Sequence, residues 1–254
     1  MASQPASPHV ARVAALIRRY GTGTGVVTAL DGVDLALTRG QFTAIMGPSG
    51  SGKSTLMHVM AGLDSATGGR AWLGDVDITE LTDAELTLLR RRRVGFVFQA
   101  FNLLPTLDVR GNVLLPFELD GRRPSAAEQQ WVDTLIDSLG LRERLSHRPH
   151  ELSGGQQQRV AIARALATRP EVVFADEPTG NLDSRTGREV LKLLADASRS
   201  HGQSIAMVTH DPIAASFADR VVFLADGHVA RDEPRRSPEQ LSAIMLTMES
   251  EAAA

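Results

Sequence analysis

The sequence predicts an α/β fold in which helices cover both faces of a mostly parallel sheet. Apolar runs of about four to six residues recur along the chain, and helical stretches such as residues 184–200 separate them. A chain of 254 residues is long enough to bury a sizeable core as one large domain. The composition, 43% hydrophobic and 22% charged, is also ordinary for a globular protein.

An antiparallel sheet is predicted near the N-terminus from the stretches VARVAALI, GVDLAL and RAWLGDVDI. Residues 40–63 are predicted to form a strand, a glycine turn and a helix, with Leu56, Val59 and Met60 on one face of that helix. The other strands of the parallel sheet are expected within residues 94–98, 169–178, 203–212 and 220–227.

The chain changes character between residues 100 and 160. AFNLLPTLDVRGN is loop-like, whereas PSAAEQQWVDTLIDSLGLRERL carries apolar residues in helical phase. A single domain over residues 10–235 is therefore expected, with its core in 10–99 and 161–235 and a helical subdomain in 100–160.

The tail, residues 236–254, is predicted to hold a short helix that either caps the sheet or meets a partner. Only the two ends, residues 1–9 and 249–254, are expected to be disordered. The apolar residues that would share one face of the tail helix are Leu241, Ile244, Met245 and Met248.

Composition excludes several classes of function. A net charge of −3 gives no general attraction to nucleic acid, and the absence of cysteine excludes disulfides and thiolate metal sites. No apolar run is long enough to cross a bilayer and no export signal is visible, so a soluble chain is expected whose membrane role would come through a partner. Arg90–Arg93 end a predicted helix, where cations favour the helix dipole, and we interpret them as a solvated face.

A phosphate-binding loop is the strongest motif. MGPSGSGKST fits the pattern G-x-x-x-x-G-K-[ST], and it lies between a predicted strand and a predicted helix as its mechanism requires. Successive backbone N–H groups would surround an anion, Lys53 would reach the β and γ phosphates, and Ser54 would ligate Mg²⁺. The chain has only one other lysine, Lys192. The predicted nucleotide-binding residues are Gly47, Pro48, Ser49, Gly50, Ser51, Gly52, Lys53, Ser54 and Thr55.

Two carboxylates end the apolar run EVVFADEP. In a regular strand adjacent side chains point to opposite sides, so Asp176 and Glu177 can take separate roles only if the chain turns there. Asp176 is assigned to Mg²⁺ through a water molecule, and Glu177 is assigned as the general base for the attacking water. Solvated acids at a strand end are the alternative, and the neighbouring phosphate loop disfavours it. The fold class is thus that of a P-loop nucleoside triphosphatase of the RecA-like type.

With these motifs in place, LSGGQQQR makes the chain resemble the ATP-binding subunit of ABC transporters over residues 10–235. The resemblance implies ATP hydrolysis with ATP and Mg²⁺ as ligands. It also implies a head-to-tail dimer, with itself or with a homologous ATPase subunit, in which one subunit's signature meets the nucleotide held by the other. Asp183 would lie at the dimer interface. The signature residues are Leu152, Ser153, Gly154, Gly155 and Gln156, and Ser153 also fits a helix cap.

Three further residues take roles from the same resemblance. Tyr20 would stack on adenine, although a core or strand-end tyrosine is the plain alternative. Gln99 would contact Mg²⁺ or the lytic water. His210, in MVTHD, would hold the γ-phosphate and orient Glu177 or the water, although a histidine at a strand end is more often structural.

The resemblance also implies a separate membrane permease, docked near residues 99–120 on the cytoplasmic face of the cell membrane. FNLLPTL followed by NVLLPF, with EPTGNLD later, resembles the branch that includes macrolide export, lipoprotein release and antimicrobial-peptide resistance ATPases. Efflux or transmission of mechanical force is therefore expected. A cell-division regulator, which signals through a permease-like partner without transport, remains the alternative. Nucleic acid is not expected as a partner, since DNA-maintenance relatives carry long coiled coils and no sustained heptads occur here.

Overall fold

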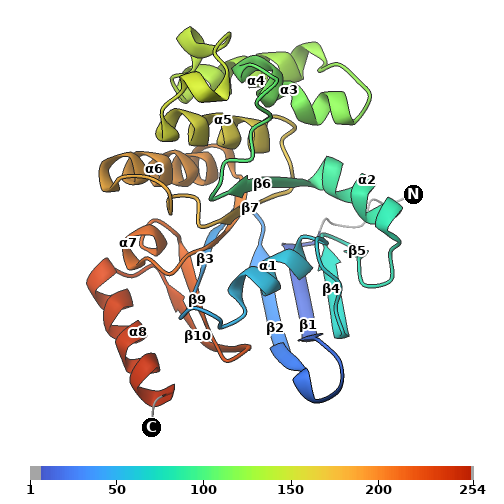
Figure 1. Ribbon diagram of the computed structural model, residues 1–254, viewed down its shortest axis with the longest axis vertical. Helices are drawn as coiled ribbons and strands as arrows, with labels where there is room; N and C mark the ends of the chain where they lie inside the picture. The colour runs from blue at the N-terminus through green and yellow to red at the C-terminus, as the bar shows by residue number, and fades with distance from the viewer. Residues whose placement is uncertain (1–6, 253–254) are drawn as a thin grey trace.

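The computed structural model describes residues 7–252, and two sheets form the framework of this part of the chain (Figure 1). In the larger, six-stranded sheet, β3 pairs in parallel with β8 and β9, and β7 pairs in parallel with β6 and β8. The antiparallel edge strand β10 was not predicted, because its sequence HVARDEP has no apolar run. In spatial order the strands are β10 (His228–Pro234), β9 (Arg220–Ala225), β3 (Phe42–Met46), β8 (Ser204–Val208), β7 (Val172–Asp176) and β6 (Val94–Phe98).

The smaller sheet is the antiparallel sheet that the N-terminal sequence predicts. Its four strands pair in the order β2-β1-β4-β5, and all three pairings are antiparallel. The α/β fold class, with a mostly parallel sheet and an N-terminal antiparallel sheet, is therefore confirmed. The strands are β1 (His9–Tyr20), β2 (Val27–Thr38), β4 (Gly68–Leu73) and β5 (Val76–Asp77).

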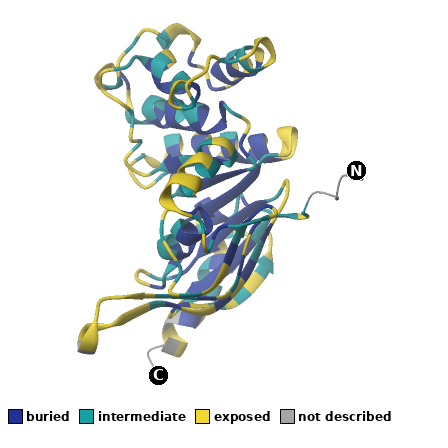
Figure 2. Cartoon of the chain, turned by 90° about the vertical axis from the view of Figure 1, so that its right-hand side faces the viewer, coloured by how far each residue is buried: buried dark blue, intermediate teal, exposed yellow. Residues whose placement is uncertain are grey.

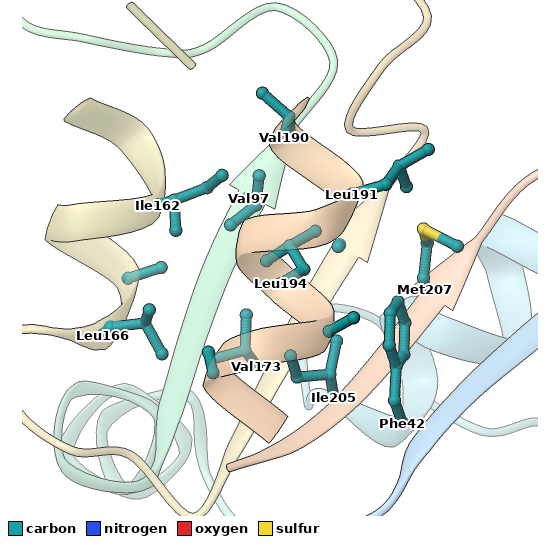
Figure 3. Packing of buried hydrophobic residues seen from close by; sticks show 14 of the residues in the cluster. Phe42, Val97, Ile162, Leu166, Val173, Val190, Leu191, Leu194, Ile205 and Met207 are labelled. Carbon is teal, nitrogen blue, oxygen red and sulfur yellow. The ribbon is translucent and has the colours of Figure 1, made fainter. Parts of the chain in front are cut away.

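Both faces of the larger sheet are buried, each in its own hydrophobic cluster. On β7, Val173 and Ala175 belong to one cluster, whereas Val172 and Phe174 belong to the other, as the alternation of a strand requires. Figure 3 shows the first cluster, in which α6 lies across the strands with α5 beside it. Figure 2 shows these strands as the buried centre of the molecule. Burial on both faces explains why the predicted strands are continuous apolar runs.

The helices lie on both sides of the larger sheet, and α3, α4 and most of α5 form the part above it in Figure 1. None of the helices within residues 7–252 has the length and hydropathy needed to cross a bilayer. Their bounds are α1 (Lys53–Met60), α2 (Asp83–Arg93), α3 (Val109–Leu119), α4 (Ala126–Ser138), α5 (Gly154–Leu166), α6 (Ser184–His201), α7 (Pro212–Ala215) and α8 (Pro238–Ala252). Short 3₁₀ turns occupy Gly23–Gly25, Arg142–Arg144 and Pro149–Glu151.

One helix of the inserted region differs from the sequence prediction. The stretch assigned to a loop up to Asn112 already contains the start of α3, which Asp108 caps by accepting a hydrogen bond from the backbone of Gly111 at 2.7 Å. Gly111 and Pro116 obscure the helical pattern because both residues are poor helix formers. The boundary placed at residue 160 falls within α5, so the subdomain border does not coincide with the end of a helix.

The tail helix α8 packs on the protein itself. Leu241, Met245 and Met248 are buried in the same cluster as α7, whereas Leu246 on the opposite side is 66% exposed. The tail helix therefore covers the chain's own core, in agreement with the first of its two predicted roles, to cap the sheet. Disorder was wrongly predicted for residues 249–252, which belong to α8, and for His9, which begins β1. Residues 7 and 8 are described and lie outside any helix or strand, and the rest of the predicted ends, residues 1–6 and 253–254, lies outside the described residues.

Candidate nucleotide site

The phosphate motif forms a tight loop between β3 and α1. Gly47 and Gly52 have φ values of +153° and +97°. A Cβ atom at Gly47 would lie 2.0 Å from the carbonyl oxygen of Leu224, and one at Gly52 would lie 2.4 Å from that of Ala29. Only glycine fits at both positions, so the backbone can pack closely while it curves.

This loop brings together donor groups that suit an anion. No side chain caps the N-terminus of α1, and the buried hydroxyl of Ser51 has no hydrogen-bond partner among the described residues. The ammonium group of Lys53, a residue only 8% exposed, donates to the carbonyl oxygen of Pro48 at 2.7 Å. Burial lowers the pKa of Lys53, and the nearby Glu177 and Asp176 oppose that shift. A helix N-terminus with an unpaired hydroxyl and an ammonium group suits a phosphate group.

The two carboxylates diverge at the end of β7 because the chain turns at Glu177. Glu177 has a φ of +43°, a left-handed conformation that costs a residue other than glycine about 1–3 kcal/mol. Hydrogen bonds hold it there: its N–H donates to Val208 O at 3.0 Å, and its carbonyl accepts from Gly180 at 3.0 Å. The turn that the sequence requires for two separate roles is therefore present.

Each carboxylate has its own contacts. The hydroxyl of Ser54 donates to Asp176 Oδ1 at 3.3 Å, and His58 Nε2 lies 3.9 Å from Asp176 Oδ2. Glu177 Oε1 instead lies 2.8 Å from Nδ1 of His210, the histidine that follows β8. Burial raises the pKa of Asp176 and Glu177 adds to this rise, whereas His58, Ser54 and Lys53 oppose it.

The donor set fits Mg²⁺. A serine hydroxyl and a carboxylate meet beside the phosphate loop, and both are oxygen ligands of the kind that Mg²⁺ takes together with phosphate oxygens. Between residues 7 and 252 there is no group of three or more His, Cys, Asp or Glu that could hold a metal ion unaided.

Gln99 follows β6 at the same edge of the sheet, since Phe98 pairs with Asp176 in the parallel register. Its side-chain amide donates to Asn181 Oδ1 at 3.3 Å, and Asn181 Nδ2 donates to the carbonyl oxygen of Gln99 at 2.9 Å. Sequence reasoning missed Asn181, because nothing in EPTGNLD indicates a contact with a residue 82 positions earlier.

The signature residues begin α5. Ser153 caps the helix by accepting from Gln156 N at 3.3 Å, as predicted, and the Gln156 side chain accepts from Ser153 N at 2.9 Å. A Cβ atom at Gly155 would lie 2.2 Å from Thr186 Cγ2, at the start of α6. Asp183 caps α6, and hydrogen bonds from Thr186 and Arg185 lower its pKa. The N-termini of the two helices therefore lie against each other.

The signature has no polar link to the phosphate loop of its own chain within the described residues. Among residues 7–252 no hydrogen bond or salt bridge joins residues 152–156 to residues 47–55. The role of Gln158 was also not predicted from the sequence. Its buried side chain donates to Pro178 O at 2.6 Å and so connects α5 to the loop after Glu177.

Tyr20 ends β1 and is 39% exposed. Its hydroxyl donates to Asp64 Oδ2 at 2.6 Å, and the guanidinium carbon of Arg18 lies 4.4 Å from the ring centroid. The side chain is thus anchored at the surface and is not a core tyrosine, but its place at the end of β1 agrees with the strand-end alternative.

Together, the loop, the carboxylate pair and the polar residues at the carboxyl ends of β3, β6, β7 and β8 define a P-loop nucleoside triphosphatase. A protein-family model described as ABC transporter matches residues 30–180. The chain belongs to the ABC transporter family and is an ATPase cassette of that family.

Individual relatives agree with this assignment. The chain is 47% identical over 223 residues to the macrolide export ATP-binding/permease protein MacB of Marinobacter nauticus. The matched residues make up 88% of this chain but only 34% of the MacB protein. It is 45% identical over 214 residues to the lipoprotein-releasing system ATP-binding protein LolD 1 of Rhodopseudomonas palustris, covering 84% of this chain and 95% of that one. The dimeric post-hydrolysis structure of the ATP-binding cassette MJ0796, bound to ADP and Pi, is similar to this chain, with a TM-score of 0.79 and 40% sequence identity. The similarity covers 89% of this chain and 99% of the MJ0796 chain.

Proposed function

We propose that this chain hydrolyses ATP with Glu177 as the general base and drives a separate membrane permease. The separation of the carboxylates carries the chemical part of the proposal. Asp176 contacts Ser54 at the phosphate loop, whereas Glu177 contacts His210, which can orient it toward the attacking water. A bound Mg²⁺ would neutralise charge on the transferring phosphoryl group, and Ser54, Asp176 and Gln99 are the residues that would hold it. Lys53 and the loop N–H groups would bind the phosphates, and Tyr20 would stack on the adenine.

Two copies of the chain form the working unit in this proposal. The N-terminus of α5, with Ser153 at its cap, is itself suited to an anion, yet no hydrogen bond or salt bridge among residues 7–252 joins it to the phosphate loop of its own chain. The similar MJ0796 cassette is dimeric with bound ADP and Pi. A head-to-tail pair would place Ser153 and Gly155 of one subunit on the γ-phosphate bound by Lys53 of the other, and such an interface closes at two copies.

A mixing experiment tests the composite site. Ser153→Arg blocks the signature and Lys53→Ala disables the phosphate loop, so neither variant alone is expected to dimerise with a non-hydrolysable ATP analogue. Mixed together, they retain one intact site per heterodimer, formed by the loop of the first and the signature of the second. We therefore expect an ATP-dependent heterodimer by cross-linking only in the mixture. No heterodimer in the mixture, with a dimer in the wild-type control, contradicts a site made in trans.

We infer that the permease would dock on a groove lined in part by residues of the segment 99–120, where the resemblance leads us to expect it. A cavity of about 510 Å³ lies between α2, β6, α3 and α5. Its apolar lining includes Phe98, Leu115 and Leu119, and its charged lining is Arg90, Arg91 and Arg164, without any Asp or Glu. Arg90 and Arg91 thus line this groove rather than only a solvated face.

The charge of the groove indicates what would bind there. Burial lowers the pKa of Arg164, and its guanidinium group donates to the carbonyl oxygens of Asn102 and Phe101 at 2.6 and 2.9 Å. Since no carboxylate lines the groove, an apolar permease segment that carries an acidic side chain complements it.

Leu119→Glu is expected to weaken permease binding. Leu119 is 60% exposed, so the change should leave folding intact. It would remove an apolar contact of about 1.5–3 kcal/mol, which corresponds to about 10- to 150-fold in affinity. The measurement is co-purification of the permease with the tagged chain from membranes in mild detergent. Leu246→Glu on α8, at a residue 66% exposed and away from the groove, is the matched control. Equal recovery with both variants contradicts docking in the groove.

The relatives indicate the type of system. Because the chain matches both a macrolide export protein and a lipoprotein-releasing ATPase, we propose efflux or transmission of mechanical force at the cytoplasmic face of the membrane. The chain would be held there by its permease. Identification of that permease by mass spectrometry in the same purification distinguishes an exporter from a signalling partner.

A further inference from the structure

Gln99 is held by a residue far along the chain. The Gln99 side-chain amide donates to the side chain of Asn181, and the Asn181 side chain donates back to the main-chain carbonyl of Gln99. The distances are 3.3 and 2.9 Å. Both residues are exposed, so the two hydrogen bonds are not a by-product of core packing.

A third residue shapes this contact. A Cβ atom at Gly180 would lie 2.7 Å from Gln99 Nε2 and 3.0 Å from its Cδ. Gln99 therefore lies directly against the backbone at Gly180, and any side chain there would displace it. The Gly180 backbone and the hydrogen bond to Asn181 Oδ1 thus locate the Gln99 carboxamide, while Asn181 Nδ2 holds the main chain of the same residue.

The chemistry of the carboxamide determines which of its atoms can bind a metal ion. The group has an NH₂ that donates and an oxygen that accepts, and only the oxygen is a ligand for Mg²⁺. Asn181 engages the NH₂ of Gln99, which leaves Oε1 without a hydrogen bond among the described residues. Partners of this kind orient metal ligands in many proteins and are worth about 10- to 100-fold in metal affinity.

We propose that Asn181 is a positioning residue that orients the Gln99 carboxamide so that its oxygen is available to the metal. This inference rests on the proposed function, in which Gln99 is a Mg²⁺ ligand. Asparagine suits the task because its side chain both accepts from Gln99 Nε2 and donates to Gln99 O. The contact also connects the segment after β6 to the loop that ends at Asp183, the cap of α6.

The test measures metal affinity without turnover. Mn²⁺ serves as the probe, and its binding to the ATP-bound Glu177→Gln protein is followed by electron paramagnetic resonance. In this background Asn181→Leu, which keeps the side-chain size but removes both hydrogen bonds, is expected to weaken Mn²⁺ binding about tenfold. Gly180→Ala is expected to act in the same direction, because it displaces Gln99. Ser184→Ala, at an exposed neighbour that makes no hydrogen bond with Gln99 among the described residues, is expected to match the parent protein.

A double-mutant cycle separates this inference from the function on which it rests. If Asn181 acts through Gln99, Gln99→Ala alone weakens Mn²⁺ binding, and adding Asn181→Leu to it changes nothing further. Unchanged affinity in Asn181→Leu, with a loss in Gln99→Ala, overturns the role of Asn181 and leaves that of Gln99. A further loss when Asn181→Leu is added to Gln99→Ala also overturns it. No loss in Gln99→Ala overturns the metal role of Gln99 itself.

A spectroscopic measurement provides a second readout. In the protein without metal or nucleotide, the side-chain amide resonances of Gln99 are expected to shift in Asn181→Leu, while those of Gln203 stay in place. Gln203 donates to Pro170 O at 3.0 Å and makes no hydrogen bond with Asn181, so it is an internal control. Unshifted Gln99 resonances would contradict the contact.

Discussion

Replacing Glu177 by glutamine is expected to retain ATP binding, lower the turnover number by about 10²- to 10⁴-fold, and trap the dimer with its nucleotides. Glutamine keeps the size of the side chain and its contact with His210, but it cannot accept the proton of the attacking water. The phosphate loop is untouched, since Lys53 and Ser54 belong to other elements. The measurements are phosphate release for turnover and size-exclusion chromatography with ATP for the dimer.

Glu171→Gln is the matched control for this prediction. Glu171 immediately precedes β7 and so lies at the end of that strand opposite to Glu177, where it pairs with Arg39 at 2.9 Å and Arg93 at 3.3 Å. Loss of the Glu171 carboxylate is expected to leave turnover unchanged, because its ion pairs lie at the end of β7 opposite to the phosphate loop. Normal phosphate release by Glu177→Gln would refute the assignment of the base.

Lys53→Ala is expected to lower ATP affinity by about 10²- to 10⁴-fold. Two hydrogen bonds from a charged donor to the β and γ phosphates are worth about 1.5–3 kcal/mol each, and about 1.4 kcal/mol corresponds to tenfold in affinity. Lys53 is only 8% exposed and lies within the loop, so no other ammonium group can replace it.

A second lysine provides the matched control for the loss of the Lys53 side chain. Lys192 is the only other lysine, and it is exposed on α6. Lys192→Ala removes the same side chain from the surface and is expected to leave ATP affinity unchanged, as measured by titration with a fluorescent ATP analogue. Equal affinity in the two variants would show that the loop does not hold the phosphates.

Local patterns predicted those parts of the molecule that local chemistry determines. A parallel strand buried on both faces is mostly apolar, and β3, β7 and β8 are such runs apart from Thr43, Asp176 and Ser204. The phosphate loop was found because glycine is required where the backbone turns and packs closely, as at Gly47 and Gly52. Ser153 was recognised as a cap because the capping hydrogen bond joins residues three positions apart.

Features that depend on contacts between distant residues were not predicted. The polar edge strand β10 exists because β9 offers it a partner, and α3 forms despite Gly111 and Pro116. The contact of Asn181 with Gln99 spans 82 residues, so no spacing rule reaches it. The left-handed conformation of Glu177 likewise depends on Val208 of a neighbouring strand, which its N–H contacts.

The fit between Gly155 and Thr186 has a consequence for how force passes through the molecule. With a Cβ atom excluded at 2.2 Å, the first turn of α5 cannot slide toward α6, and Gln158 fastens the same helix to Pro178. The starts of α5 and α6 are therefore closely packed and tied to the same loop, and we expect a displacement of one, by a permease or by a second subunit, to move the other.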